Sequence, residues 1–384
     1  MVKRSPVRKT LASLAAELRV SRTTVSNAYN RPDQLSPALR ERILAAAAAH
    51  GYSGPDPMAR SLRTRRVGSI GVVLTEDLSY AFEDAASVDF LAGMAQGLAG
   101  KNSTLTLIPA GPDTAEDTGA AELLGRAVVD GFVVYSVGDD DPYLAAATAR
   151  GLPVVVCDQP RDTGQPFVGI DDFAAIAPAA QALVDAGHTT VGILSIRLRH
   201  ERLDGAVDRD NLAAAEFDTQ RLRVQGALKT FADAGIDADE IPVVTRHINN
   251  RDTAREAAEE LLSNNPELTA VLCTTDSMAL GVMDYAESHG ISIPEQLSVT
   301  GFDGIESARL RGLSTIRQPN FDKGAEAGRM LAELIDATVA NTAYPTADDG
   351  SPLRVLLDTE FSPGDTIAAP RGNSDALSAK PARR

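Results

Sequence analysis

The chain has 384 residues, of which 43% are apolar and 23% charged, so it has room for two or three domains with substantial cores. No apolar run reaches the roughly 18 residues that span a bilayer, and the N-terminus lacks the apolar centre of a secretory signal, so we expect a cytoplasmic protein without membrane contact. The net charge of −16 is uneven: residues 1–66 hold 13 Lys and Arg against 4 Asp and Glu, and the remainder holds 24 against 49. A basic head on an acidic body is typical of a protein whose head contacts nucleic acid.

The first structured segment is predicted over residues 10–30, TLASLAAELRVSRTTVSNAYN. Its apolar residues form two stripes at helical spacing, separated by a break at Arg19-Val20, which is helix-turn-helix spacing. The hydroxyls of Thr10 and Ser21 can cap the two helices. The second helix then exposes four polar side chains that suit a DNA major groove: Arg22, Thr23, Ser26 and Asn27. From this pattern alone, an amphipathic helix pair packing on another surface remains an equal alternative.

A third helix is predicted after Ser36-Pro37, with the hydroxyl as its cap and Gly51 at its end. Residues 1–54 therefore form a candidate DNA-binding domain. Residues 55–66, PDPMARSLRTRR, follow as a strongly basic hinge with one large apolar side chain, Leu62. A plain linker is the favoured interpretation of the hinge by itself. The alternative is a short helix whose arginines meet phosphates while Leu62 wedges between minor-groove base steps.

From residue 67 to residue 367 apolar runs alternate with helical stretches. We predict strands over 69–74, 104–108, 131–136, 153–158, 191–195, 241–245, 270–274 and 298–302, and helices over 90–98, 174–186, 223–234, 255–263 and 277–287. Continuous apolar strands, each followed by a helix, indicate parallel sheets covered on both faces. The fold class is therefore α/β, with a three-helix head, a hinge, and a body of two doubly wound subdomains. A TIM barrel is the alternative for the body.

Two segments differ from this pattern. Residues 199–217 are long and charged for a connection between a strand and a helix, which favours a mobile lid or a partner surface over core. Residues 368–384 are rich in Pro, Ser and Ala without periodicity, so we expect a disordered tail.

Motifs for catalysis are missing from the sequence. It contains no G-x-G-x-x-G after a strand, no phosphate-binding G-x-x-x-x-G-K-[ST], no G-x-S-x-G and no H-E-x-x-H, and its five histidines are scattered. Cys157 and Cys273 lie in strand-like runs, so we expect buried free thiols. The sequence therefore predicts no enzyme, no cofactor and no metal site.

Polar residues instead follow the predicted strands, where open parallel sheets bind ligands. Asp158 ends VVVCD, Asp303 ends SVTGFD, and Asp276 follows AVLCTT. Arg223 is predicted to open a helix just after the long connection. Two carboxylates and a guanidinium in one cleft can bind hydroxyl-rich or amino groups. Asp276 is more simply a helix cap, and Arg223 is equally well an exposed ion-pair partner.

Taken together, these motifs resemble those of the lactose-repressor (LacI/GalR) family of bacterial transcription regulators. The resemblance runs from residue 10 to about residue 370. It rests on the helix-turn-helix segment, LSPALRERILAAAAAHGY, DPMARSLRTRR, VGSIGVVL, VDGFVVY, FVGIDDFAAIAPAAQALVDAGHTTVGILS, RLRVQGAL, LCTTDSMALGVMDYA, VTGFDGIESARL and LSTIRQP.

The resemblance implies a homodimer that binds double-stranded DNA at a pseudo-palindromic operator. It also implies a body like the periplasmic sugar-binding proteins, with a small polar effector, sugar or nucleoside-like, between two subdomains. By motif position, the DNA-binding residues are Thr10, Ser21, Arg22, Thr23, Thr24, Ser26, Asn27, Ser36, Ala59 and Leu62. The effector-binding residues are Phe82, Asp158, Arg223, Phe302, Asp303 and Gln318. On this basis Leu62 is expected to be the minor-groove wedge rather than part of a plain linker.

Three features depart from the family pattern. Arg19 stands where the family usually has Gly, residues 199–217 are an unusual insertion, and no leucine-heptad tail follows the body, so we expect dimers rather than tetramers. The function expected from the sequence is a DNA-binding transcriptional regulator, a repressor, whose operator affinity is controlled by the effector. The alternative is a cytoplasmic small-molecule-binding protein without DNA function.

Overall fold

The computed structural model describes residues 10–52, 54, 65–74, 78–110 and 117–370. The chain forms two compact units, Met1–Gly68 and Ser69–Arg384, which we call the head and the body. The hinge residues Ala59 and Leu62, and residues 371–384 of the expected tail, lie outside the described residues. Within the described part of the chain, no helix is both long and apolar enough to cross a membrane.

The head consists of α1 (Leu11–Leu18), α2 (Arg22–Asn30), the 3-10 turn η1 (Pro32–Gln34) and α3 (Pro37–Ala49). The three predicted caps are confirmed, because the hydroxyls of Thr10, Ser21 and Ser36 accept hydrogen bonds from the backbone N–H groups of Ser13, Thr24 and Leu39. The predicted break is confirmed as well: Arg19 takes a left-handed conformation with φ of 55°, at some steric cost for a residue with a Cβ.

Small apolar side chains from all three helices close the core of the head. Its buried members are Leu14, Ala15, Val25, Ala28, Ile43 and Ala47. Leu14, Val25 and Ile43 come from different helices and are fully buried. Each helix is too short to be stable alone in water, so this shared core holds the helix-turn-helix together.

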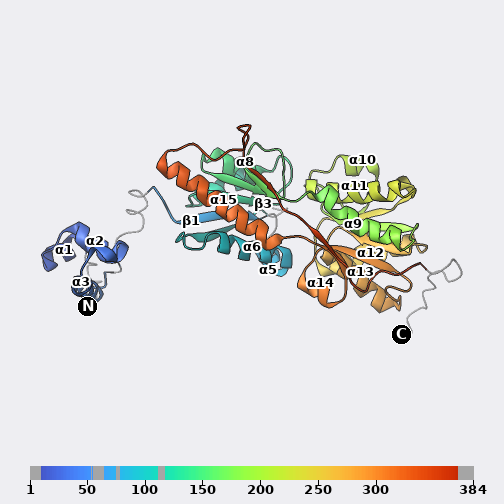
Figure 1. Ribbon diagram of the computed structural model, residues 1–384, viewed down its shortest axis with the longest axis horizontal. Helices are drawn as coiled ribbons and strands as arrows, with labels where there is room; N and C mark the ends of the chain where they lie inside the picture. The colour runs from blue at the N-terminus through green and yellow to red at the C-terminus, as the bar shows by residue number, and fades with distance from the viewer. Residues whose placement is uncertain (1–9, 53, 55–64, 75–77, 111–116, 371–384) are drawn as a thin grey trace, which may run out of the picture. The chain divides into compact units, whose positions relative to one another are not determined.

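The first subdomain of the body is a six-stranded parallel sheet in the order β12-β5-β4-β3-β1-β2. Its strands are β1 (Ser69–Leu74), β2 (Thr104–Pro109), β3 (Phe132–Tyr135), β4 (Val154–Cys157), β5 (Phe167–Gly169) and β12 (Arg354–Leu356). Its helices are α5 (Leu78–Glu83), α6 (Ala85–Gly97), α7 (Asp117–Arg126), α8 (Pro142–Ala149) and α15 (Asn320–Ala340). α6 and α15 pack on one face of the sheet, and α7 and α8 contribute to a separate core on the other (Figure 1).

The second subdomain is a seven-stranded sheet in the order β13-β11-β10-β9-β6-β8-β7, parallel except for the two edge strands. Its strands are β6 (Val191–Ile196), β7 (Gly205–Ala206), β8 (Val243–Arg246), β9 (Ala270–Cys273), β10 (Ser298–Asp303), β11 (Ser314–Arg317) and β13 (Glu360–Ser362). Its helices are α9 (Asp172–Asp185), α10 (Arg209–Ala213), α11 (Asp218–Asp233), α12 (Arg251–Asn264), α13 (Asp276–His289) and α14 (Glu306–Leu310), with a 3-10 turn η3 (Ala238–Glu240). α9 and α11 cover one face and α12 and α13 the other.

The chain crosses between the subdomains three times: from β5 to α9, from β11 to α15, and from β12 to β13. Two separate open sheets rule out the TIM-barrel alternative. The doubly wound expectation is confirmed, and each predicted strand overlaps an observed one. Short strands such as β5 and β12 were missed, because three residues give no periodicity to detect.

Residues 199–217 do not behave as the sequence predicted. β7 pairs antiparallel with β8, and Val207, Leu212 and Ala215 are buried in the core beside α9 and α11. Phe217 is buried as well. The preference for a lid or partner surface over core was therefore wrong. The charged residues of the insertion bind backbone groups. Asp208 caps α10, and Arg209 donates hydrogen bonds to the carbonyls of Ala238 and Ile241, which attaches the insertion to the body.

Candidate functional site

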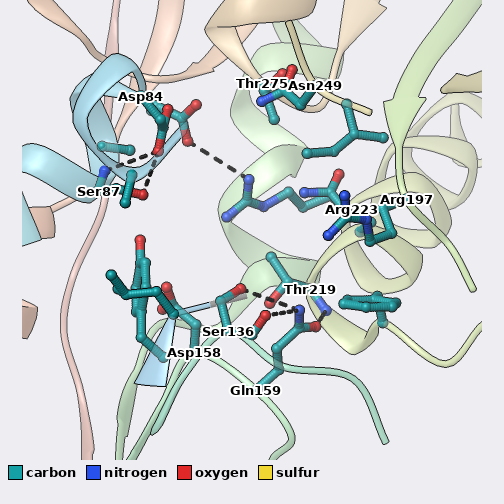
Figure 2. A pocket seen from close by; sticks show the side chains of 18 residues that line it. Asp84, Ser87, Ser136, Asp158, Gln159, Arg197, Thr219, Arg223, Asn249 and Thr275 are labelled. Carbon is teal, nitrogen blue, oxygen red and sulfur yellow. Dashed lines mark hydrogen bonds and ion pairs between the residues drawn. The ribbon is translucent and has the colours of Figure 1, made fainter. Parts of the chain in front are cut away.

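A cleft lies where the carboxyl ends of strands from both sheets meet, and it encloses a cavity of about 120 Å³. This volume suits a small metabolite rather than a peptide. The lining residues are Leu74, Ala81, Asp84, Ala86, Ser87, Tyr135, Ser136, Asp158, Gln159, Ile196, Arg197, Phe217, Thr219, Gln220, Arg223, Asn249, Thr275 and Asp303. Figure 2 shows Asp84 and Asp158 on one side of this cavity and Arg197 and Arg223 on the other.

Three of the lining residues have left-handed backbones at the ends of strands. Ser136, Asp158 and Asp303 have φ of 58°, 68° and 127°, which non-glycine residues rarely adopt. They follow or end β3, β4 and β10. Strained backbones of this kind concentrate at binding sites, where the surrounding fold holds side chains in fixed positions.

Arg223 anchors the second subdomain's side of the cleft and is only 3% exposed. Its Nε donates to Asp172 Oδ1 at 2.9 Å, and its Nη1 donates to the Thr274 carbonyl at 2.9 Å and lies 3.8 Å from Asp303 Oδ1. The guanidinium stacks on the ring of Phe302, 3.7 Å from its centroid. The interpretation of Arg223 as an exposed ion-pair partner is therefore wrong. It also does not open its helix, because α11 begins at Asp218.

Asp276 and Asp303 are two neighbouring buried carboxyl groups, of which Asp303 lines the cavity and Asp276 does not. Burial raises the pKa of Asp303 well above its ordinary value, with Arg223 opposing the shift and Asp276 adding to it. Burial also raises the pKa of Asp276 to about 6, although the Thr315 hydroxyl and the Ile305 N–H both donate to its carboxylate. Thr275, not Asp276, caps α13, so the helix-cap interpretation of Asp276 was wrong.

Asp158 is balanced by a lysine that the sequence did not suggest. Lys323 Nζ donates to both carboxylate oxygens of Asp158, at 2.8 and 2.9 Å, and to Gln318 Oε1 at 2.8 Å. Gln318 Nε2 then donates to Asp303 Oδ1 at 2.6 Å. A continuous set of polar contacts therefore joins carboxylates of the two subdomains through the β11–α15 crossover.

The six predicted effector residues fall into three groups. Asp158, Arg223 and Asp303 line the cavity together. Phe302 and Gln318 lie behind it, as the platform under Arg223 and the link between Lys323 and Asp303. Phe82 is on α5, 63% exposed, and is not among the lining residues.

Several lining residues were missed by sequence reasoning. Gln159 connects the two subdomains: its Nε2 donates to the Ser136 hydroxyl at 3.2 Å, and its Oε1 accepts from the Thr219 N–H at 2.8 Å (Figure 2). Asp84 caps α6 by accepting from Ser87, and burial raises the pKa of its carboxyl group. The signal for Gln159 was its place directly after a strand. No sequence pattern pointed to Asp84, because its helix lies at the cleft only in the folded protein.

The insertion also reaches across the cleft. The Asp139 N–H donates to the Glu216 carbonyl at 2.8 Å, and His200 Nε2 donates to the Asp139 carbonyl at 3.1 Å. The His200 N–H in turn donates to Glu216 Oε2 at 2.7 Å. Phe217, which ends the insertion, lines the cavity under the guanidinium of Arg197, 5.9 Å from its ring centroid.

In the head, the predicted DNA-facing residues differ in exposure. Arg22 and Thr23 are exposed on the first turn of α2, and Asn27 is partly exposed, with its Nδ2 donating to Gln34 Oε1 at 3.0 Å. The hydroxyls of Thr24 and Ser21 are hydrogen-bonded to each other at 2.8 Å. Ser26, in contrast, is only 7% exposed.

Among the described residues, no group of three or more His, Cys, Asp or Glu side chains is placed to hold a metal ion. Cys157 and Cys273 are free and buried, as expected. Burial raises the pKa of both thiols well above the ordinary value, which keeps them in the unreactive thiol form.

Comparison with known proteins places this architecture in a family. Residues 67–356 match the model of periplasmic binding proteins and the sugar binding domain of the LacI family. The HTH-type transcriptional regulator IpsA of Corynebacterium glutamicum is 54% identical over 94% of this chain and 97% of its own length. An HTH-type transcriptional regulator of Mycobacterium tuberculosis is 48% identical over 94% of this chain and 98% of its own. The crystal structure of a LacI-family transcriptional regulator from Corynebacterium glutamicum superimposes with a TM-score of 0.73 at 50% identity, covering 93% of this chain and 98% of that one. The chain belongs to the LacI family of helix-turn-helix, DNA-binding transcriptional regulators.

Proposed function

We propose that this regulator is a cytoplasmic repressor that binds its operator as a homodimer. Its operator affinity is controlled by a neutral, hydroxyl-rich metabolite bound in the cleft. The observation that carries the proposal is the cavity formed by both subdomains, with polar side chains from each one on its wall. A ligand in such a place contacts both subdomains at once, so its binding energy depends on their relation. The cleft carries no catalytic constellation that we recognise, and we propose no enzymatic activity.

The charges of the cleft favour a neutral ligand. Asp158 is paired with Lys323, and Arg223 is paired with Asp172. The raised pKa values of Asp84 and Asp303, both caused first by burial, favour the protonated, uncharged forms of these groups. An added ammonium group would therefore lack a free counter-charge, whereas hydroxyl groups can donate and accept along the wall. Arg197, which also lines the cavity, donates to the His247 carbonyl. A sugar or nucleoside-like effector meets this description.

For the head we propose that Arg22, Thr23 and Asn27 read bases in the major groove. They lie on α2, whose N-terminus is exposed, and Arg and Asn have the donor and acceptor geometry for guanine and adenine. Thr10, Ser21, Thr24 and Ser36 lie at helix N-termini, where hydroxyls and free N–H groups together suit a phosphate. Ser26 is left out of the proposed DNA contacts, because its side chain is buried and not exposed as the sequence predicted.

The hinge residues Ala59 and Leu62 complete the proposed DNA contacts, with Leu62 as a wedge between minor-groove base steps. Helix-turn-helix modules read half-sites in pairs, one helical turn or a multiple apart, and this geometry supports a homodimer on a pseudo-palindromic operator. Large apolar side chains that stay exposed on the body, such as Phe82 and Leu310, supply surface that a second copy can cover.

DNA footprinting with the wild type, Arg22→Ala and Leu62→Ala tests the proposed contacts. We expect the wild type to protect a palindromic site, with affinity that falls steeply between about 50 and 200 mM salt because phosphate contacts release counterions. Arg22→Ala should lose protection at one position of each half-site, and Leu62→Ala should lose protection at the centre of the operator. Arg126→Ala, an exposed substitution on the body, is the control. Unchanged protection in both variants would remove the assigned contacts.

A thermal-shift screen of sugars, polyols and nucleosides tests the effector class. We expect a neutral member to raise the unfolding temperature of the full chain. Thr219→Val should weaken that effect, since Thr219 lines the cavity and its buried hydroxyl has no hydrogen-bond partner among the described residues. Ligand binding without salt-dependent DNA binding would instead favour a small-molecule-binding protein without DNA function.

A further inference from the structure

A buried lysine stands beside the effector cavity. Lys323 is on α15, one helical turn after the β11–α15 crossover, and is 0% exposed. Its three hydrogen bonds all go to acceptors of the site already described: the two oxygens of Asp158 and Gln318 Oε1. Lys323 is not among the residues that line the cavity, so it reaches Asp158 from the protein interior.

The position of this cation determines which ligand groups Asp158 can bind. An unpaired carboxylate in a buried cleft attracts an ammonium group strongly, because little solvent screens the interaction. Here the ammonium is supplied by the protein. The two oxygens of a carboxylate have about four lone-pair sites, and Lys323 occupies two of them, so Asp158 can still accept from a hydroxyl.

The same cation also fixes the second carboxylate. Lys323 holds Gln318 by its Oε1, which turns the Nε2 of that amide toward Asp303 at 2.6 Å. Since an amide has one acceptor and one donor end, this orientation follows from the lysine. Lys323 therefore sets the charge at Asp158 and the hydrogen bonding at Asp303, one from each subdomain.

We propose that Lys323 is a specificity-determining residue: a built-in counter-cation that makes the cleft accept neutral hydroxyl donors at Asp158 and reject ammonium groups. The inference deepens the proposed function and rests on the cleft being the effector site. Removing the lysine should convert Asp158 into a cation-binding position.

The test is a chemical-rescue experiment, in which Lys323 is truncated to alanine and a small molecule that resembles the missing part of its side chain is added. Lys323→Ala lacks three carbons and the ammonium, which propylammonium supplies and 1-propanol supplies without the charge. In the full chain we expect propylammonium to raise the unfolding temperature of Lys323→Ala by on the order of 3 °C more than 1-propanol does at the same concentration. The wild type and the charge-neutral control Lys323→Ala/Asp158→Asn should show no such difference.

An equal response of Lys323→Ala to the amine and the alcohol would overturn the inference, and so would the same amine preference in the wild type or in the double variant. If Lys323→Ala does not fold alone, the comparison moves to refolding. Propylammonium should then restore a cooperative unfolding transition that 1-propanol does not restore, and failure of both to do so would count against the inference.

A second experiment tests whether Lys323 controls which ligand binds. It compares the affinities of the wild type and Lys323→Ala for D-glucose and D-glucosamine, and for D-galactose and D-galactosamine. Each pair differs by one hydroxyl against one ammonium group. We expect Lys323→Ala to shift the ratio of affinities toward the amino sugar by at least about tenfold relative to the wild type. If none of the four sugars binds the wild type, they are excluded as effectors under the proposed function. The propylammonium comparison then still decides the role of Lys323.

Discussion

The head and the body place their functional side chains in opposite environments. In the head, a small apolar core is closed by three helices, and the proposed base-reading residues Arg22 and Thr23 are exposed on one of them. In the body, Asp158, Arg223 and Asp303 are buried and come from three different elements. Function in the head is therefore separable from stability, whereas in the body the same charged groups serve both.

The largest expected effect of this difference is on Arg223. Arg223→Ala removes one of the two cations that pair with the buried Asp172, Arg161 being the other, and it also removes the cation near the buried Asp303. We therefore expect a loss of about 3–5 kcal/mol in the free energy of unfolding. Denaturant unfolding of the full chain measures it. Arg221→Ala, two residues away and bound to Asp218 in a more exposed pair, should cost less than about 1 kcal/mol. Equal losses in the two variants would mean that burial does not set the importance of these charges.

A second test uses pH. Burial raises the pKa of Asp276 to about 6, above the ordinary value of an aspartate, so the folded protein binds this proton more tightly than the unfolded chain does. The resulting stabilisation is present below about pH 4 and is lost as the pH rises through about 6. Relative to Asp276→Asn, the wild type should lose on the order of 2 kcal/mol between pH 4 and pH 7. A difference that stays constant or grows with pH would show that the carboxyl group is not destabilised by burial in the fold.

In the head, loss of a functional side chain should change DNA affinity and leave folding intact. Arg22→Ala should weaken operator binding by about 1–3 kcal/mol, roughly 5- to 150-fold, with an unfolding temperature equal to that of the wild type. Fluorescence anisotropy on a selected operator and a thermal scan give the two numbers. The separation between function and stability would fail if the variant lost stability as well.

The smallest expected effect concerns the cap of α2. Ser21→Ala removes the hydroxyl that accepts from the Thr24 N–H, at a cost of about 1 kcal/mol to the head. Hydrogen exchange on the full chain should become several-fold faster in peptides from residues 10–52 and stay unchanged in the body. Thr148→Ala, on an exposed helix of the body, is the matched control. Faster exchange throughout both units would show that the head is not an independent unit.

The contrast between head and body also explains what the sequence could predict. In the head, caps at Thr10, Ser21 and Ser36 and the break at Arg19 depend on residues a few positions apart, so local pattern was sufficient. In the body, strand ends located Asp158 and Asp303 because parallel strands align their carboxyl ends. Both its place after the long connection and the family resemblance suggested Arg223 for the cleft, although Arg223 does not open its helix as predicted.

What the sequence could not give depends on contacts between distant residues. In the sequence, Lys323 looks like an ordinary polar residue of a helix. Only the fold brings it into contact with Asp158, which lies 165 residues earlier in the chain. The insertion looked like an exposed segment because its charges are numerous, although Asp208 and Arg209 bind backbone groups. Composition cannot distinguish a solvated charge from one that holds a loop in place.

The most direct test of effector control is the operator affinity of the full chain with and without a metabolite that stabilises the body. If the cleft and the head are coupled, a ligand that raises the unfolding temperature should change the dissociation constant for DNA by about 5- to 150-fold, equivalent to about 1–3 kcal/mol of coupling. The change should shrink in Thr219→Val at the same ligand concentration. A ligand that stabilises the body yet leaves the DNA dissociation constant unchanged would contradict effector control.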